Sequence, residues 1–199
     1  MPNATKVFIG GSRRLSCLNP EVRRRLDNII GKGLTVIVGD ANGADRAIQS
    51  YLASKNYDKV EVFCMAGGCR NNVGNWLTRV ITVRPESRRD FAYYSTKDRA
   101  MGEEADYALM LWDGKSRGTL TNIRDLVRQE KPVVVYLAPS KTFVTLRDSG
   151  ELVLLENRLT AHSFRHPISS NPAYQKAMAL RGKIRLDIDL DTSRERRRP

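Results

Sequence analysis

Three short turns in this chain combine glycine with residues that can bind an anion. Each turn follows an apolar run typical of a buried strand and precedes a helical pattern. The turns are Gly10-Gly11-Ser12-Arg13-Arg14, Gly39-Asp40-Ala41-Asn42-Gly43-Ala44-Asp45-Arg46 and Asp113-Gly114-Lys115-Ser116-Arg117-Gly118-Thr119. A strand that passes through glycines into a helix leaves backbone N–H groups free, with the positive end of the helix dipole behind them. Because this geometry suits a phosphate, three such turns predict a nucleotide-like ligand.

Carboxylates lie on the same turns. Asp40, Asp45 and Asp113 fall at or just after the carboxyl ends of expected strands, which is the edge where open α/β sheets bind ligands. Each also has a structural explanation. Asp40 and Asp113 can cap their own turns, and Asp45 is favoured at a helix start, where Arg46 can pair with it. We predict that Asp113 contacts a ligand, through a pair of ribose hydroxyls, and it is our candidate catalytic residue.

Other residues near the turns have two readings each. Arg99, with Asp98 before it, belongs either to a solvated helix face or to a group that turns toward the ligand. Trp112 ends a strand beside a glycine turn, where it either closes the core or stacks on a base. Arg13 and Arg14 either bind phosphate by charge-assisted hydrogen bonds or belong to a mobile loop of a basic protein.

The composition describes a soluble globular chain with a strong positive charge. Of 199 residues, 41% are hydrophobic and 28% charged, and the net charge is +12. No apolar run approaches the roughly 20 residues that span a bilayer, and the first residues show no signal-peptide layout. We therefore expect a cytoplasmic protein with no membrane partner. Nucleic acid is a possible partner, although few aromatic residues lie among the basic groups at 13–14, 23–25, 88–89 and 194–198.

The cysteines indicate neither a disulfide framework nor a metal site. Cys17, Cys64 and Cys69 are odd in number and form no CxxC pair, and the two histidines lie far from them in the sequence. We expect free thiols in a reducing compartment and no bound metal.

Alternating apolar and amphipathic segments predict an α/β fold. We expect strands at 6–10, 34–38, 60–64, 107–111 and 132–137, and helices at 20–30, 44–55, 87–104 and 120–129; residues 75–83 fit a short helix or a strand. Asn19 is a natural N-cap and Pro20 a natural first helical residue. Buried strands separated by helices indicate a Rossmann-like, doubly wound parallel sheet of about five strands. The first and fourth of these strands should be neighbours where the strand order reverses, so that Gly10-Gly11 and Gly118-Thr119 face one crevice.

After residue 139 the pattern changes. The pattern predicts a small β-hairpin that pairs residues 141–146 with 151–155 around Asp148-Ser149-Gly150. It also predicts a helix at residues 171–180 and a disordered basic tail at the last residues. We therefore divide the chain into a nucleotide-binding domain at 1–139 and an appendage at 140–199.

The order of the turns resembles the SLOG superfamily, named for the DNA-processing protein A and Lonely Guy groups, and within it small YspA-like proteins. The matching strings are Gly10-Gly11-Ser12-Arg13, Gly43-Ala44-Asp45-Arg46-Ala47 and Gly114-Lys115-Ser116-Arg117-Gly118-Thr119, and the likeness covers residues 6–138. The resemblance implies a fold that binds nucleotides, nucleosides or NAD-derived ligands, and relatives of this kind often form homo-oligomers. Some relatives cleave N-glycosidic bonds with a carboxylate just after the glycine-threonine turn. This chain has Asn122 there, which cannot supply a negative charge.

We therefore predict a binding protein, a sensor or carrier, for a nucleotide or NAD-derived small molecule, which requires no cofactor and forms a homo-oligomer. One alternative is an N-glycosidase acting on a nucleoside monophosphate, and another is a nucleic-acid-binding module. The predicted ligand-binding residues are Gly10, Gly11, Ser12, Arg13, Gly39, Asp40, Asn42, Gly43, Asp45, Arg46, Arg99, Trp112, Asp113, Ser116, Gly118, Thr119 and Asn122.

Overall fold

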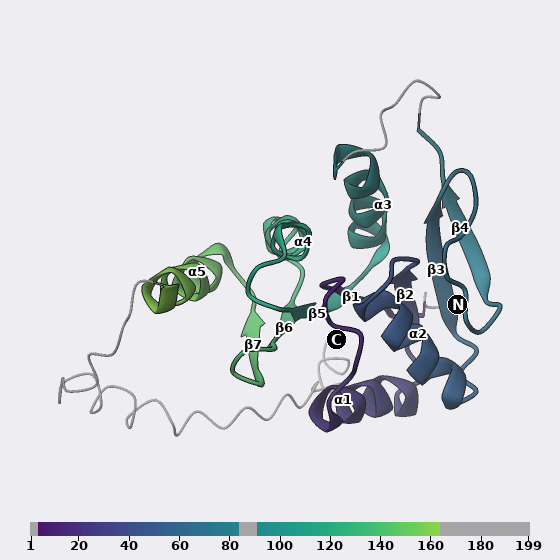
Figure 1. Ribbon diagram of the computed structural model, residues 1–199, viewed down its shortest axis with the longest axis horizontal. Coiled ribbons are helices and arrows are strands. Elements are labelled where there is room, and N and C mark those ends of the chain that lie inside the picture. Colours follow the sequence, from purple (N-terminus) through teal and green to yellow (C-terminus); the bar gives the residue numbers. More distant parts are fainter. Residues whose placement is uncertain (1–3, 84–90, 164–199) are drawn as a thin grey trace, which may run out of the picture. The chain divides into compact units, whose positions relative to one another are not determined.

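The computed structural model describes residues 4–83 and 91–163 of the chain. They form one seven-stranded sheet and five helices (Figure 1). The strands are β1 (Lys6–Gly11), β2 (Thr35–Gly39), β3 (Val60–Met65), β4 (Leu77–Ile81), β5 (Tyr107–Trp112), β6 (Val133–Leu137) and β7 (Thr142–Leu146). The helices are α1 (Pro20–Gly31), α2 (Ala44–Ser54), α3 (Phe91–Glu104), α4 (Arg117–Arg128) and α5 (Ser149–Ser163). By internal contacts the chain divides into a unit at Met1–Leu159, which carries the sheet, and a unit at Thr160–Pro199.

The strand order is β4-β3-β2-β1-β5-β6-β7, parallel from β4 through β6. The first half of the chain builds outward from β1 in one direction and the second half in the other, so the order reverses between β1 and β5. Gly11 pairs in register with Leu111 of β5, and a Cβ on this glycine would overlap the Leu111 carbonyl oxygen. The predictions of a Rossmann-like α/β fold and of neighbouring first and fourth expected strands are confirmed.

Helices cover both faces of the sheet. Helices α1 and α2 lie on one face, and α3 and α4 on the other (Figure 1). Successive residues of β1 point to opposite faces, so Val7 and Ile9 pack with the first helix pair while Phe8 packs with the second. Because each face is buried, the strands read as continuous apolar runs rather than alternating ones. Both faces of the sheet are therefore covered, and the turns that follow its parallel strands lie at the carboxyl ends of those strands.

Local signals begin α1 and α2 where the sequence predicts. The Asn19 side chain accepts a hydrogen bond from the Val22 N–H, with Pro20 as the first residue of α1. Helix α4 begins three residues earlier than expected, at Arg117, because Ser116 is its N-cap and accepts a hydrogen bond from the Thr119 N–H. Its first turn, including Gly118, is therefore helical.

The expected strand count of about five is too low. Strand β4 lies in the segment that fits either a helix or a strand, and β7 adds an antiparallel edge by pairing with β6. The predicted hairpin between residues 141–146 and 151–155 is wrong, because residues 149–163 are helical. The supposed turn is a helix start: the Asp148 carboxylate accepts the Glu151 N–H at 2.9 Å, and the Glu151 carboxylate accepts the Arg147 N–H at 2.7 Å.

Some predictions fall outside the described residues. These are the helix at 171–180, the basic tail and the first residues of the helix expected from Ser87. Among the helices that are described, none has the length and apolar character needed to cross a membrane.

Candidate functional site

A cavity of about 550 Å³ lies at the carboxyl ends of β1 and β5, where the strand order reverses. We call it the rim cavity. Its walls come from the β1–α1 turn, the β5–α4 turn with the start of α4, and one side of α3. Ala41 and Asp45 after β2 and Arg70 after β3 complete the lining. Such a crevice is where open α/β sheets bind ligands.

The β1–α1 turn forms one wall, with Gly10, Gly11, Ser12, Arg13 and Arg14. Ser12 is buried, and its N–H donates to the Leu111 carbonyl at 2.9 Å. Its carbonyl accepts the Ala44 N–H at 3.2 Å, so this turn is tied both to β5 and to the start of α2. The Arg13 and Arg14 side chains are exposed at the mouth of the cavity.

The β5–α4 turn forms the opposite wall. One Asp113 oxygen accepts the N–H groups of Lys115, at 3.0 Å, and of Ser116, at 2.7 Å. Burial opposes ionisation of Asp113, but these two N–H donors hold its pKa below the usual range. Asp113 thus caps its own turn and also lines the cavity, beside Gly118 and Thr119 in the first turn of α4.

The β2–α2 turn contributes less than predicted. Of its residues only Ala41 and Asp45 line the rim cavity. Gly39 lies behind them, and a Cβ there would overlap the Asp45 carboxylate. Asn42, Gly43 and Arg46 line a separate depression on the other side of Arg13. The structure therefore divides the predicted residues of this turn between two places.

Asp40 anchors two cations that line the rim cavity. Its carboxylate accepts hydrogen bonds from Lys97 Nζ at 2.8 Å, and from Arg70 Nη2 at 2.7 Å and Nε at 3.1 Å. Asp40 and Lys97 are both buried. Burial opposes the charge on Asp40, but the hydrogen bonds from Arg70 and the charge of Lys97 hold its pKa well below the usual range. The acid is therefore a positioning residue for Arg70 and Lys97.

Two further carboxyl groups, those of Asp45 and Asp98, line the cavity. Burial raises the pKa of Asp45 to about 6, although the charge of Lys97 and a hydrogen bond from the Ala41 N–H act against the shift. Burial also raises the pKa of Asp98, whose Oδ2 accepts a hydrogen bond from Asn122 Nδ2 at 3.1 Å. With a pKa of about 6, the Asp45 carboxyl group can exchange protons near neutral pH.

Helix α3 supplies a wall that the sequence interpretation largely missed. Tyr94, Lys97, Asp98 and Met101 line the cavity, whereas Arg99 is exposed on another side of the helix and does not. The residues that do line it follow the spacing of one helical face. That periodicity was the available signal, and it selects Asp98 and not Arg99.

Arg70 was also missed, because its loop follows β3 and carries no glycine-turn motif linked to a helix. The guanidinium carbons of Arg70 and Arg13 lie 5.1 and 5.7 Å from the centre of the Tyr94 ring. Trp112, by contrast, is buried in the core, and its Nε1 donates to the Ser116 carbonyl at 3.0 Å. Of its two readings, the structure supports the core one.

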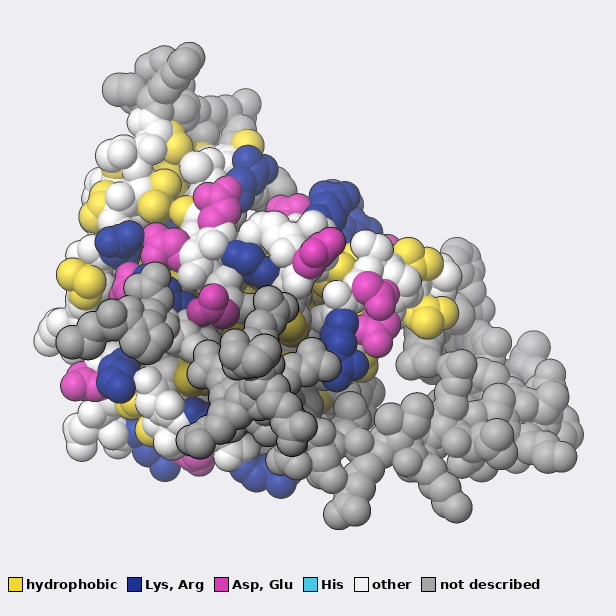
Figure 2. All heavy atoms as spheres, turned by 180° about the vertical axis from the view of Figure 1, so that it is seen from behind, with side chains coloured by type: hydrophobic (Ala, Val, Ile, Leu, Met, Phe, Trp, Pro, Cys, Tyr) yellow, Lys and Arg dark blue, Asp and Glu magenta, His cyan; other side chains and the backbone are white. Residues whose placement is uncertain are grey.

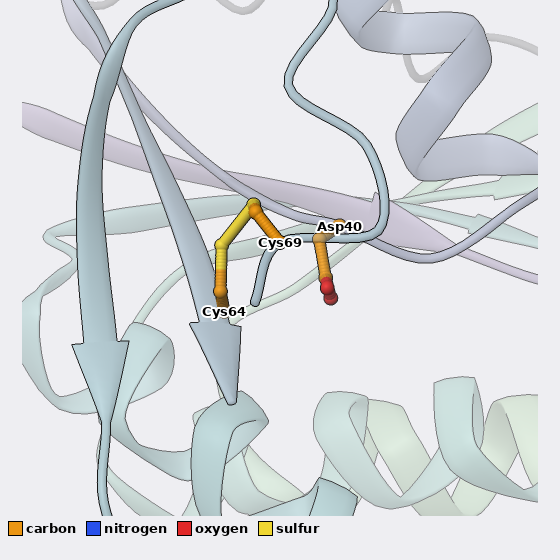
Figure 3. Close-up of side chains that lie close together, drawn as sticks. All are labelled: Asp40, Cys64 and Cys69. Carbon is orange, nitrogen blue, oxygen red and sulfur yellow. A yellow bond between two sulfur atoms is a disulfide. The ribbon is translucent and has the colours of Figure 1, made fainter. Parts of the chain in front are cut away.

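The prediction of free thiols is wrong for two of the three cysteines. Cys64 and Cys69 form a disulfide, and Cys17 is free and exposed. Figure 3 shows Cys64 on a strand, Cys69 on the loop that follows it and the Asp40 side chain beside them. The loop folds back through Gly67 and Gly68, both with positive φ, and this return of the chain has no CxxC signature.

Among the described residues, these three side chains form a group whose atoms are of the types that bind metal ions. One ligand atom from each of Asp40, Cys64 and Cys69 lies within 4.8 Å of the other two. The donor set does not fit a cation here, because the two sulfurs are bonded to each other and Asp40 is already paired with Lys97 and Arg70.

Among the comparisons with known proteins, only the comparison of structures found similar proteins. The sequence matches no protein-family description and no curated protein. DNA processing protein A from Helicobacter pylori, whose structure is described for a unique single-stranded DNA binding mode, superposes with a TM-score of 0.52 and 16% identity over 89% of this chain and 81% of that one. DNA processing protein A from Streptococcus pneumoniae gives 0.50 and 12% over 82% of this chain, and this chain spans 63% of that one.

At identities this low, the structural likeness shows the fold alone. The finer YspA-like assignment stays a prediction. The fold is the one that the resemblance of the turns implies: this chain has a Rossmann-like fold similar to that of DNA processing protein A.

Proposed function

We propose that the rim cavity binds a phosphate-bearing nucleotide or an NAD-derived small molecule, and that the protein acts as its sensor or carrier. The observation that carries the proposal is that two glycine turns from opposite halves of the chain, at Gly10-Gly11 and Gly118-Thr119, line the same cavity. The start of α4 adds first-turn N–H groups that no intrahelical carbonyl satisfies.

The charges of the cavity fit such a ligand. Arg13, Arg14, Arg70 and Lys115 supply positive charge from three separate segments, and arginine forms paired hydrogen bonds with phosphate oxygens. The carboxyl groups of Asp45 and Asp98 lie among the same lining residues and can accept hydrogen bonds from ribose hydroxyls or a base amine. A ligand that is anionic at one end and a hydrogen-bond donor at the other would satisfy both sets.

Thermal unfolding in the presence of nucleoside monophosphates and NAD tests the proposal. A bound ligand should stabilise the folded chain by about 2.7 kcal/mol at a concentration of one hundred times its Kd. Gly118→Val should abolish this stabilisation, because the larger side chain occupies space at the cavity wall where the ligand binds. Most of the fold should stay intact, because this turn lies at the ends of the strands and outside the core. Gly31→Val is the control, since a Cβ at Gly31 meets no atom within 4 Å. Equal binding by Gly118→Val and wild type would place the ligand elsewhere.

A second candidate function is hydrolysis of an N-glycosidic bond. It is favoured by the hydrogen bond between Asn122 and Asp98, because the asparagine stands where related hydrolases carry their carboxylate and its side chain holds another carboxyl group in the cavity. Asp98 is then a stronger candidate for the reacting acid than Asp113, which caps its own turn.

Chromatography of free base released from nucleoside monophosphates tests this second function. Asp98→Asn should abolish release, whereas Asp113→Asn, which keeps a turn-capping oxygen, should retain it. Loss in Asp113→Asn alone would restore the original catalytic prediction, and no release from any nucleotide by the wild type would remove the hydrolase.

A third candidate is binding of single-stranded nucleic acid, which the description of the Helicobacter pylori protein favours. The chain's charge of +12 agrees with it. On the face shown in Figure 2, however, acidic side chains lie among the basic ones. Binding of this kind should weaken steeply with salt, because neutralised phosphates release counterions. An affinity for oligonucleotides that is unchanged when Arg13 and Arg14 are both replaced by Gln would exclude this cavity as the nucleic-acid site.

A further inference from the structure

A second depression, of about 700 Å³, lies beside the rim cavity. It is bounded by the loop after β1, the first half of α1 and the outer side of α2, and we call it the arginine groove. Arg13, Arg23 and Arg46 line it, and no aspartate or glutamate is among its described lining residues. Arg13 lines both depressions, so they are adjacent.

The groove has a defined position relative to the cavity. Gly43, at the start of α2, has φ +84°, and a Cβ there would overlap the backbone carbonyl of Arg13. The loop that carries Arg13 therefore packs directly on α2 and separates the two depressions. The Arg23 guanidinium carbon lies 5.9 Å from the centre of the Tyr51 ring, which restricts one of the three cations.

We propose that the arginine groove holds a second anionic group of the ligand bound in the rim cavity, so that the ligand is a dinucleotide or short oligonucleotide with phosphates on both sides of Arg13. This inference rests on the proposed nucleotide site. Guanidinium groups from three segments, with no lining carboxylate to neutralise them, match the paired hydrogen bonding of phosphate oxygens. A mononucleotide would fill the rim cavity and leave the groove unused.

Calorimetry with two probes tests the groove. Wild type should bind 5′-phosphorylated dithymidylate more tightly than thymidine 5′-monophosphate, and Arg46→Gln should weaken the dinucleotide by about tenfold, as expected for loss of a charge-assisted hydrogen bond, without changing the mononucleotide. Arg24→Gln is the matched control, because Arg24 is exposed on α1, pairs with Glu21 and lies outside the lining of the groove. Equal affinities for the two probes, or equal effects of the two variants, would overturn the inference.

Cys17 provides a second readout. It is the one free cysteine of the chain, it is exposed, and it lines the groove. With no reductant present, the dinucleotide should slow its reaction with N-ethylmaleimide, whereas saturating mononucleotide should not. Binding of the dinucleotide without protection of Cys17 would contradict occupancy of the groove. Absence of binding by either probe would instead contradict the proposed function itself.

The disulfide carries a separate inference. Cys64 is buried at the end of β3, Cys69 lies on the loop that follows, and Arg70 is the next residue. The bond therefore restrains the short loop that brings the Arg70 guanidinium to Asp40 and to the Tyr94 ring in the rim cavity. Disulfides in reducing compartments are usually transient or redox-sensing.

We infer that thiol–disulfide exchange at this pair adjusts the anion affinity of the rim cavity through Arg70. A thiolate of a dithiol reductant attacks the Cys69 sulfur, because Cys64 is buried; the S–S bond breaks and Cys64 leaves as a thiolate that takes a proton. The second thiol of the reductant then resolves the mixed disulfide and releases Cys69 as a thiol. Two electrons and two protons pass to the protein, and the reductant becomes a disulfide.

Hydrogen exchange at residues 66–71 tests this inference without any ligand. Dithiothreitol should accelerate exchange in the wild type, and Cys69→Ser should exchange fast with or without reductant. Cys17→Ser should respond as the wild type does. Inorganic phosphate, as a probe of the cavity, should bind about threefold or more weakly to the reduced protein, since one charged donor is less well held. Unchanged exchange on reduction, or a response to reductant in Cys69→Ser, would overturn the switch.

Discussion

The Lys97 ammonium group is buried among carboxyl groups at the rim cavity. It donates a hydrogen bond to Asp40, and its charge lowers the pKa values of Asp40, Asp45 and Asp98 against the effect of burial. This buried cation therefore favours the charged form of all three carboxyl groups.

Asp45→Asn should change how stability depends on pH. The unfolded chain releases the Asp45 proton near the ordinary aspartate pKa of 3.8, whereas the pKa in the folded chain is about 6. Between these values the folded state binds more protons, so the stability of the wild type falls as pH rises. The variant lacks this loss and should gain roughly 3 kcal/mol relative to the wild type between about pH 4 and pH 7.

Urea unfolding at the two pH values measures the effect of Asp45→Asn. Asp58→Asn, at an exposed position outside the rim cavity, is the control substitution. A constant difference between Asp45→Asn and the wild type would show that Asp45 ionises normally in the folded protein.

Lys97→Met should destabilise the protein by roughly 3 kcal/mol at pH 7, because it leaves buried carboxylates without their cation. The loss should be smaller near pH 4, where Asp45 is largely protonated. Lys115→Met removes a cation that is exposed at the same cavity and should cost little. Urea unfolding compares the variants, and equal losses for the two would contradict a special role for Lys97.

At the scale of elements, the joint between the β1–α1 turn and the start of α2 sets the shape of both depressions. The Ser12 carbonyl accepts the Ala44 N–H, and the backbone of Arg13 packs on Gly43. Only glycine fits this place, because φ is +84° and a Cβ has no room. The motif that first indicated a ligand site is thus also a packing requirement between two elements.

Gly43→Ala should lower the free energy of unfolding by roughly 2 kcal/mol or more and weaken ligand binding in both depressions. Gly31→Ala, at the end of α1, meets no atom within 4 Å and should lie within about 1 kcal/mol of the wild type. Thermal unfolding and calorimetry of the two variants check this. If Gly43→Ala were as stable as Gly31→Ala, the turn and α2 would not be joined as described.

For the whole molecule, the sheet has two different edges. One ends in β7, which is antiparallel and followed by α5. The other ends in β4, which exposes Leu77 and Val80 at 64% and 57% of their surface. Exposed apolar residues on an edge strand favour association with another chain. This edge is therefore where we expect the predicted homo-oligomer to form.

Light scattering at micromolar concentration should report a mass that is a multiple of 22.5 kDa. Leu77→Lys combined with Val80→Lys should return a monomer, because charges on the edge oppose pairing. Leu154→Lys, at an equally exposed position on α5, should leave the oligomer unchanged. A wild-type mass of 22.5 kDa would refute the oligomer, and loss of association in Leu154→Lys alone would move the interface to α5.

The sequence by itself determined the order of the elements from β1 to β6, apart from β4, and the positions of the three glycine turns. Apolar periodicity, Asn19 with Pro20 and the glycines are signals that act within a few residues, so they can be interpreted without knowledge of the fold. The adjacency of the first and fourth expected strands also followed, because right-handed crossovers leave few arrangements. The same local logic failed at Asp148, where a helix cap and a hairpin turn use similar residues.

Only the tertiary structure decided which side chains share the rim cavity. Lys97 and Arg70 meet at Asp40 from segments 57 and 30 residues away, and the pKa of Asp45 depends on the burial that these segments create. The Cys64–Cys69 bond likewise depends on how one loop returns to its strand. Such pairings arise from the packing of distant elements, whose free energy depends on the whole chain, and local sequence carries no record of it.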